Sequence, residues 1–222
     1  GPGPFCGMML ADMGAEIIRI DRAGSVRGGD PASPPAVVNA RGRRSIGVDL
    51  KSEAGRDLVL RLVEDADVVF EGFRPGVAER LGVGPEDCLA RNPAIVYGRL
   101  TGWGQDGPDR HQPGFGSLVE ARTGFAAMNG YSDRPPVLPP LALADMVAGM
   151  YGGMATLVAL REVEMNRGQG QIVDLPLFDP LLAILGPQAA AYQLTGEVGT
   201  QSGSRTTTSA PRNTCHCRDG RY

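Results

Sequence analysis

Short runs of apolar and β-branched residues alternate with segments of helical spacing along most of this sequence. Each run is only a few residues long and is bounded by residues that favour turns. Such an alternation is typical of a parallel β-sheet that helices cover on both faces. The chain is therefore predicted to be an α/β protein, with strands at residues 16–20, 45–49, 67–70, 94–98 and 170–175.

The segments between these strands carry helix signals of their own. Residues 4–13 have apolar side chains near helical spacing, between a proline and Gly14. Ser52 is expected to cap the helix that follows it. A polar loop is predicted for residues 22–39. Longer helices are predicted for residues 141–160 and, as one continuous helix, for residues 176–194.

Composition limits the function classes. A net charge of −3 and a pI near 5.5 argue against a broad nucleic-acid-binding surface, which would be basic. The four cysteines are too few for a disulfide framework, so we expect a reducing, cytoplasmic setting. No basic-then-apolar leader is visible, and no signal peptide is expected. We expect the sequence to be a fragment, with both ends inside folded structure.

Asp145 is the single charged residue between positions 141 and 160. By length and composition this segment is either a membrane-spanning helix or the central helix of a soluble α/β domain, and the neighbouring strands favour the second. Near the start of such a helix, the dipole and free N–H groups favour an anion. From the residues alone, Asp145 is either a helix cap or a nucleophile in an apolar pocket.

Two other patterns do not support a site. Cys215 and Cys217 flank His216, but with no second pair of ligands they cannot complete a tetrahedral metal site, so no metal is predicted. The glycines of residues 1–7 lack the spacing of a dinucleotide-binding loop.

Several segments in a fixed order carry a more specific signal. One of them reads Glu-Gly-Phe-Arg-Pro-Gly at residues 71–76. Together they resemble the class III coenzyme A (CoA) transferase family, also called CaiB/BaiF, which includes formyl-CoA transferase and α-methylacyl-CoA racemase. The matching segments are residues 3–21, 39–51, 66–82, 102–108 and 167–174.

The resemblance implies a role for particular residues. Asp145 falls on the family's catalytic aspartate. Four residues fall on positions that contact CoA, and Gly72 stands where transferases often have asparagine. Arginines at such positions would supply charge-assisted donors to the phosphates of CoA. The four predicted CoA contacts are Arg22, Phe73, Arg80 and Leu81. No permanently bound cofactor is implied, since CoA and acyl-CoA are substrates.

The resemblance also implies an architecture and a reaction. Residues 1–194 would form a Rossmann-like large domain without its first strand, and the Gly-, Ser- and Thr-rich residues 195–222 a linker towards a small domain that is missing here. The full-length protein would be an interlocked homodimer. It would move CoA from an acyl-CoA to a carboxylic acid through an aspartyl anhydride and an aspartyl-CoA thioester, and this fragment alone is expected to be inactive.

Three alternatives remain. The first is a 2-methylacyl-CoA racemase of the same fold, which needs a second base besides the aspartate. The alignment places Phe115 or a neighbour where racemases have a histidine, and His111 is the nearby replacement. The second is a truncated, non-catalytic CoA-binding module. The third is a membrane protein.

Overall fold

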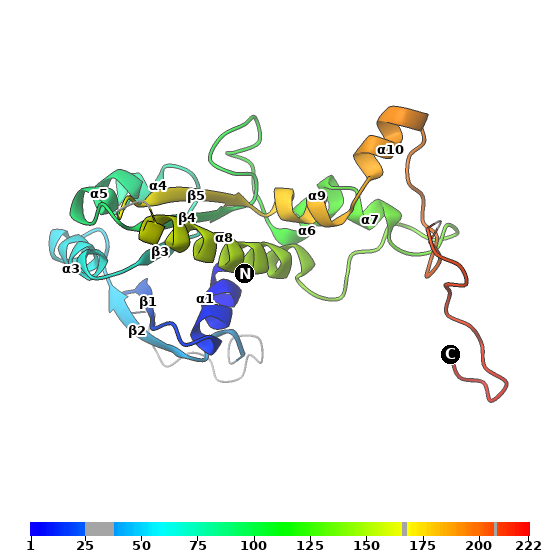
Figure 1. Ribbon diagram of the computed structural model, residues 1–222, viewed down its shortest axis with the longest axis horizontal. Coiled ribbons are helices and arrows are strands. Elements are labelled where there is room, and N and C mark those ends of the chain that lie inside the picture. The colour runs from blue at the N-terminus through cyan, green and yellow to red at the C-terminus, as the bar shows by residue number, and fades with distance from the viewer. Residues whose placement is uncertain (25–37, 166–167, 207) are drawn as a thin grey trace.

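The computed structural model describes residues 1–24, 38–165, 168–206 and 208–222. The predicted alternation of strands and helices is confirmed (Figure 1). Most of the loop predicted for residues 22–39 lies outside the described residues. The elements are α1 (Pro2–Asp12), β1 (Ile17–Arg22), β2 (Arg43–Val48), α3 (Glu53–Glu64), β3 (Val68–Glu71), α4 (Val77–Arg80), α5 (Pro85–Arg91), β4 (Val96–Thr101), α6 (Gly116–Arg122), α7 (Phe125–Met128), α8 (Leu143–Met165), β5 (Gln171–Pro176), α9 (Phe178–Ile184) and α10 (Gln188–Thr195).

All the strand pairs between these elements are parallel, as the alternation predicts. In the described residues, β1 pairs with β2, and β4 lies between β3 and β5 in a second sheet. Every residue of β4 is buried. A central parallel strand has both faces covered, and therefore reads as a continuous buried run.

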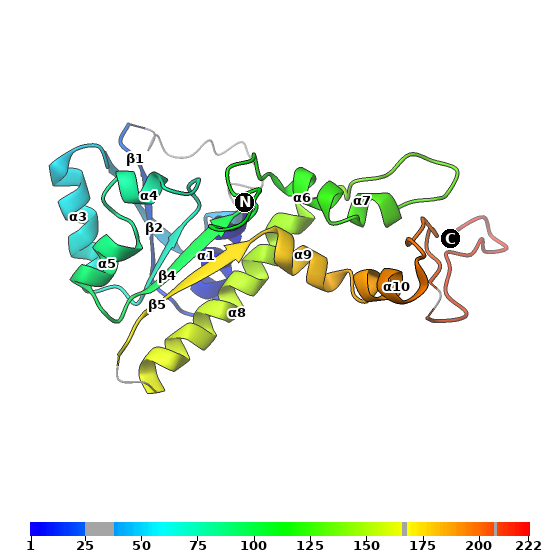
Figure 2. The same cartoon turned by 90° about the horizontal axis from the view of Figure 1, so that it is seen from above.

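Helices cover the two faces of the β3–β4–β5 sheet. On one face, Tyr97 of β4 packs with Val63 of α3 and Cys88 of α5. On the other face, Leu100 of β4 lies against α1 and α8, close to Gly3 and Gly152. Figures 1 and 2 show α8 running along this second face. The side chains of β4 therefore alternate between two helical layers.

The predicted cap at Ser52 is confirmed. Its Oγ accepts a hydrogen bond of 3.1 Å from the N–H of Gly55 in the first turn of α3. Gly55 has no room for a side chain, because a Cβ there would lie 2.0 Å from the carbonyl oxygen of Asp49. The glycine allows the strand end and the helix start to approach this closely.

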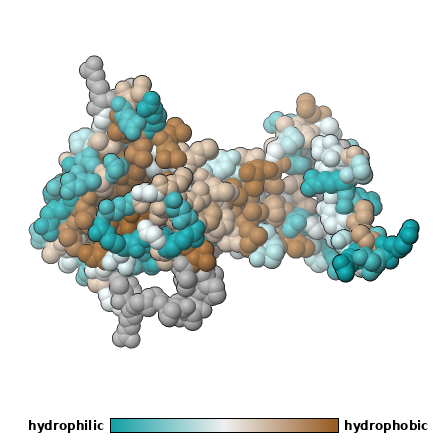
Figure 3. Space-filling model, turned by 60° about the horizontal axis from the view of Figure 1, so that its bottom comes forward, coloured by the Kyte–Doolittle hydropathy of each residue, from teal (hydrophilic) through white to brown (hydrophobic). Residues whose placement is uncertain are grey.

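The predicted long apolar helix is α8, and α1 packs closely against glycines of this helix. Pro2 and Phe5 of α1 contact Gly149, Cys6 contacts Gly152, and Met9 approaches Gly153. By length and composition α8 is the one helix in the described residues that could cross a membrane. Its contacts with α1, β4 and β5 are those of the central helix of an α/β domain. On the face seen in Figure 3, apolar surface lies between hydrophilic regions at the two ends.

The prediction of one helix over residues 176–194 is wrong. The chain forms α9 and α10, and Gly186 between them has a φ of +72°. Pro187 follows directly; it lacks an N–H for a continuing helix and disfavours helical geometry at the residue before it. Helices α6 and α7 were not predicted; both are short and neither has a side-chain cap.

Beyond Thr195 the described residues form no helix, and Figure 1 shows this tail leading away from the α/β part. An isolated bridge between Thr206 and Ser209 is the regular backbone pairing described there. The domain division at residue 194 and the further strand before residue 1 stay predictions.

Candidate active site

Asp145 lies in the first turn of α8, at the point where α1 also begins. Gly149, one turn further along α8, is in contact with Pro2 and Phe5 at the start of α1. The backbone nitrogen of Gly1, just before α1, lies near the Asp145 carboxylate. Both helices therefore direct their positive N-terminal ends towards this carboxylate, an arrangement that favours negative charge.

A third helix, α6, closes the surroundings of Asp145. A Cβ built on Gly116, the first residue of α6, would lie 3.3 Å from Asp145 Oδ2. Glu120 of α6 is 3% exposed, and its Oε1 accepts a hydrogen bond of 3.1 Å from the N–H of Ala144. This bond satisfies one of the free donors at the start of α8 and fixes the turn that carries Asp145.

Burial raises the pKa of Asp145 above its ordinary value, because the charged form loses hydration. The carboxylate is half-buried and less hydrated than an aspartate on an open surface. Such a setting suits a nucleophile better than a simple helix cap.

The predicted site residues Gly72, Phe73, Arg80 and Leu81 form a second group. Gly72 and Phe73 follow the carboxyl end of β3, Arg80 ends α4, and Leu81 is the residue after it. Phe73 is 38% exposed, and Arg80 is exposed as well. The carboxyl ends of parallel strands are where α/β folds bind ligands.

Two of these positions differ in what they can offer a ligand. Leu81 packs partly against the buried cluster of Val48, Val59 and Val83, so much of its surface serves the core. A Cβ on Gly72 would lie 3.5 Å from the carbonyl oxygen of Leu100, an ordinary contact. The position therefore accepts a side chain such as the asparagine common in the family.

Arg22 ends β1, in the other sheet, and its side chain is exposed. The structure thus places the predicted site residues on three pieces of the fold. Arg22 ends β1, the residues between 72 and 81 follow β3 and run to the end of α4, and Asp145 lies in the first turn of α8. Sequence reasoning missed Gly116 and Glu120, because residues 116–122 carried no recognised helix signal.

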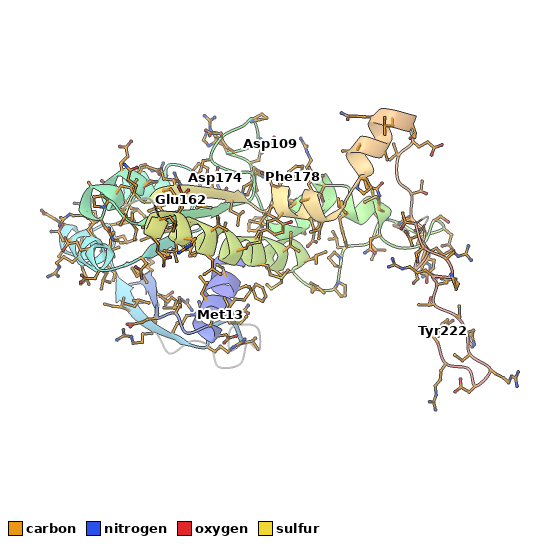
Figure 4. All side chains as sticks on the ribbon, viewed as in Figure 1. Met13, Asp109, Glu162, Asp174, Phe178 and Tyr222 are labelled. Carbon is orange, nitrogen blue, oxygen red and sulfur yellow. The ribbon has the colours of Figure 1, made fainter. Side chains whose placement is uncertain are left out.

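Asp145 does not line either of two hollows in the described part of the chain. A groove of about 550 Å³ runs between α1 and α8 and is lined by Met9, Met13, Met154 and Leu157. Figure 4 shows Met13, the residue just after α1, and Glu162 on α8, which lines the groove as well. A second hollow, of about 200 Å³, lies beside Trp103, Asp109 and Phe178.

In the described residues, no three His, Cys, Asp or Glu side chains come together in a group that could hold a metal ion. Cys215 and Cys217 are exposed, while Cys6 and Cys88 are buried. Burial raises the pKa of each of these two buried thiols to about 11, which keeps them protonated and unreactive.

Known proteins resemble this chain over nearly its whole length. A succinyl-CoA–D-citramalate CoA-transferase from Chloroflexus aurantiacus is 38% identical over 99% of this chain and 56% of its own length. A succinate–glutarate CoA-transferase from Agrobacterium fabrum is 34% identical over 98% of this chain and 58% of its own length. The chain therefore spans little more than half the length of these curated relatives.

Solved structures show the same relationship. A CaiB/BaiF family protein from Brucella suis superimposes with a TM-score of 0.88 at 32% identity, covering 99% of this chain and 61% of that one. The family described as CoA-transferase family III matches residues 1–222. The resemblance drawn from the five sequence segments is confirmed, and the chain belongs to CoA-transferase family III.

Proposed function

We propose that the full-length protein transfers CoA from an acyl-CoA thioester to a carboxylic acid, with Asp145 as a covalent relay. The observation that carries this proposal is the half-buried Asp145 carboxylate at the meeting point of α1 and α8. Membership of CoA-transferase family III supports the reaction class.

The reaction needs a nucleophile and no net proton transfer. The Asp145 carboxylate attacks the donor thioester carbonyl, the C–S bond breaks, and CoA leaves as a thiolate with an acyl-aspartyl anhydride behind it. The thiolate attacks the aspartyl carbonyl and releases the donor acid as a carboxylate. Asp145 now carries CoA as a thioester. Dividing one exchange into such steps is the usual advantage of a covalent intermediate.

The second half reverses these steps with a new acid. The acceptor carboxylate attacks the aspartyl thioester and releases the CoA thiolate. The thiolate then attacks the acceptor acyl carbonyl, which yields the new acyl-CoA and restores the Asp145 carboxylate. Negative charge develops on oxygen or sulfur in every step, and the N-terminal ends of α1 and α8 favour it there.

The relatives suggest which substrates to test first. Their names specify succinyl-CoA or acetyl-CoA as donor and citramalate, malate or oxalate as acceptor. We propose short-chain acyl-CoA donors and small dicarboxylic acid acceptors for this protein. We also propose a cytoplasmic homodimer without a bound cofactor.

The test uses the full-length protein with succinyl-CoA and a panel of dicarboxylic acids. Asp145→Ala is expected to abolish transfer and to leave the Kd for CoA within about threefold, because the carboxylate acts on the thioester carbon. Hydroxylamine added during turnover should modify Asp145, as peptide mass spectrometry can show. Asp57→Asn, an exposed carboxylate on α3, is the control and should keep full activity. Transfer by the Asp145→Ala variant would refute the assignment.

The racemase alternative meets an obstacle next to Asp145. Phe115 directly precedes Gly116, the residue whose backbone faces the Asp145 carboxylate. A phenyl ring cannot exchange a proton with the α-carbon of a substrate. His111 is exposed in the preceding connection, where its Nε2 accepts a hydrogen bond of 3.0 Å from Arg110.

We therefore expect no deuterium at the α-carbon of 2-methylacyl-CoA in heavy water, measured by mass spectrometry. Rapid α-deuteration that disappears in a His111→Ala variant would establish the racemase instead.

A further inference from the structure

A cluster of three charged side chains lies behind the segment that carries the predicted CoA contacts. Arg99 of β4 is 7% exposed and pairs in register with Glu71 of β3, which is 8% exposed. Arg99 Nε donates a hydrogen bond of 2.8 Å to Glu71 Oε1. Arg99 Nη1 lies 2.7 Å from Glu79 Oε1, which belongs to α4. One guanidinium thus joins two strands and a helix.

The cluster holds residues 72–81 at both ends. At the first end, the second oxygen of Glu71, Oε2, accepts a hydrogen bond of 2.6 Å from the N–H of Phe73. At the other end, Glu79 directly precedes Arg80 and Leu81. Gly72 and Phe73 therefore lie between these two anchors, and Arg80 and Leu81 directly follow the second.

A neighbouring hydrogen bond also attaches this segment to β4. Tyr97, two residues before Arg99 on the same face of β4, donates a hydrogen bond of 2.8 Å from its hydroxyl to the carbonyl oxygen of Val83. Val83 in turn donates its N–H to Ala78. The buried face of β4 therefore holds residues 72–83 through polar contacts as well as packing.

Stability alone gives a weak account of this cluster. Buried ion pairs lose hydration energy that their attraction only partly restores, and apolar residues of similar size would serve a core at least as well. Burial raises the pKa of Glu71, against the opposing effects of the hydrogen bonds from Phe73 and Arg99. Arg99 Nη2 is buried without a partner in the described residues. The contacts with Glu71 and Glu79 therefore compensate for the burial of the positive charge. The cluster instead fixes the geometry of the attached backbone, because each of its hydrogen bonds has a defined donor and acceptor.

We propose that Arg99, Glu71 and Glu79 are positioning residues that hold residues 72–81 in the conformation that binds the CoA part of the substrate. The inference rests on the proposed function, since it assigns a purpose to the CoA contacts of that segment. The three residues act through Phe73, Arg80 and Leu81. Substitutions at these residues should weaken the binding of CoA. They should leave the binding of the acceptor acid and the chemical steps at Asp145 unchanged.

The main experiment uses Glu79→Gln in the full-length protein. Glu79 is half exposed, so this variant should fold. It should raise the KM for acyl-CoA and the Kd for CoA by roughly three- to tenfold, as expected for one weakened charge-assisted hydrogen bond. The kcat and the KM for the acceptor acid should stay within about twofold. Glu71→Gln, which weakens both the Arg99 and the Phe73 contacts, should have a larger effect of the same kind.

Glu64→Gln is the matched control. Glu64 forms an ion pair of 2.9 Å with Arg91, and its side chain is 45% exposed, against 46% for Glu79. It joins α3 to α5 and does not touch residues 72–81. Its KM for acyl-CoA should equal that of the unaltered protein. Isothermal titration calorimetry gives the Kd for CoA, and thermal melting shows whether each variant is folded.

Two results would overturn the inference while leaving the proposed function intact. One is an active protein in which folded Glu79→Gln and Glu71→Gln keep the original KM for acyl-CoA. The other is an equal loss in kcat and in both KM values that follows the loss of melting temperature, which would mark the cluster as purely structural. An unaltered protein that neither binds nor transfers CoA would refute the proposed function, and this inference with it.

Discussion

Two glycines on the same helix should respond to alanine in opposite ways. Gly149 and Gly153 both lie on α8, and both are buried against α1. A Cβ at Gly149 would lie 2.8 Å from Phe5 Cδ1 and 3.0 Å from the carbonyl oxygen of Pro2. A Cβ at Gly153 would meet only Met9 Cε, at an ordinary 3.7 Å.

The expected energies follow from these distances. Replacing glycine by alanine inside a helix stabilises it by about 1 kcal/mol, and Gly153→Ala adds up to about 0.8 kcal/mol for the buried methyl group. The free energy of unfolding should therefore rise by about 1–2 kcal/mol in Gly153→Ala. In Gly149→Ala the same helix gain is opposed by about 1–3 kcal/mol of overpacking. The result should lie between no change and a loss of about 2 kcal/mol.

Urea unfolding of the full-length protein, followed by circular dichroism, measures both changes with the same probe. Gly149→Ala should also lower activity, because it pushes the start of α1 away from Asp145. Equal stabilisation by the two alanines would refute the close approach of α1 to α8 at Gly149.

Three further predictions concern single side chains. Ser52→Ala should lower the free energy of unfolding by about 1 kcal/mol through loss of the α3 cap, whereas Ser52→Asp should keep most of it; no difference between the two in urea melts would contradict the cap. Burial raises the pKa of the Asp145 carboxyl group above its ordinary 3.8, so the folded state favours the protonated form. The contribution of this group to stability is therefore present below pH 3.8 and is lost as the pH rises through the raised pKa. Asp145→Asn should therefore melt at a higher temperature than the unaltered protein at pH 7.5, with the difference shrinking towards pH 4; a constant difference would contradict the shift. Iodoacetamide at pH 8 should modify the exposed Cys215 and Cys217 well before the buried Cys6 and Cys88, and equal rates by mass spectrometry would contradict the burial.

The sequence predicted the features that depend on local patterns. Short apolar and β-branched runs indicated each of the five strands found in the described residues, and Ser52 indicated a helix start because capping needs only neighbouring residues. Asp145 stood out as the single charge in an apolar segment. The break between α9 and α10 was missed although Gly186 and Pro187 are ordinary stop signals, because the apolar residues on both sides read as one helix.

Features that depend on distant residues could not be predicted. Glu71, Arg99 and Glu79 lie on three elements, and only the register of β3 with β4 brings the first two together. Glu120 meets the start of α8 only because α6 folds back on it. Neither contact leaves a periodic pattern in the sequence. The family resemblance supplied the proposed role of Asp145, and the contacts around it came from the fold.

The contact between α1 and α8 has a consequence for the order in which the protein acquires activity. Phe5 and Gly149 lie far apart along the chain, so their meeting closes a very long loop. Loops of this kind are slow to close, while helices and neighbouring strands form much sooner. Helical structure can thus return during refolding before the carboxylate of Asp145 has its surroundings. Recovery of the proposed activity should trail recovery of the circular dichroism signal, which would make the surroundings of Asp145 a reporter for the last stage of folding.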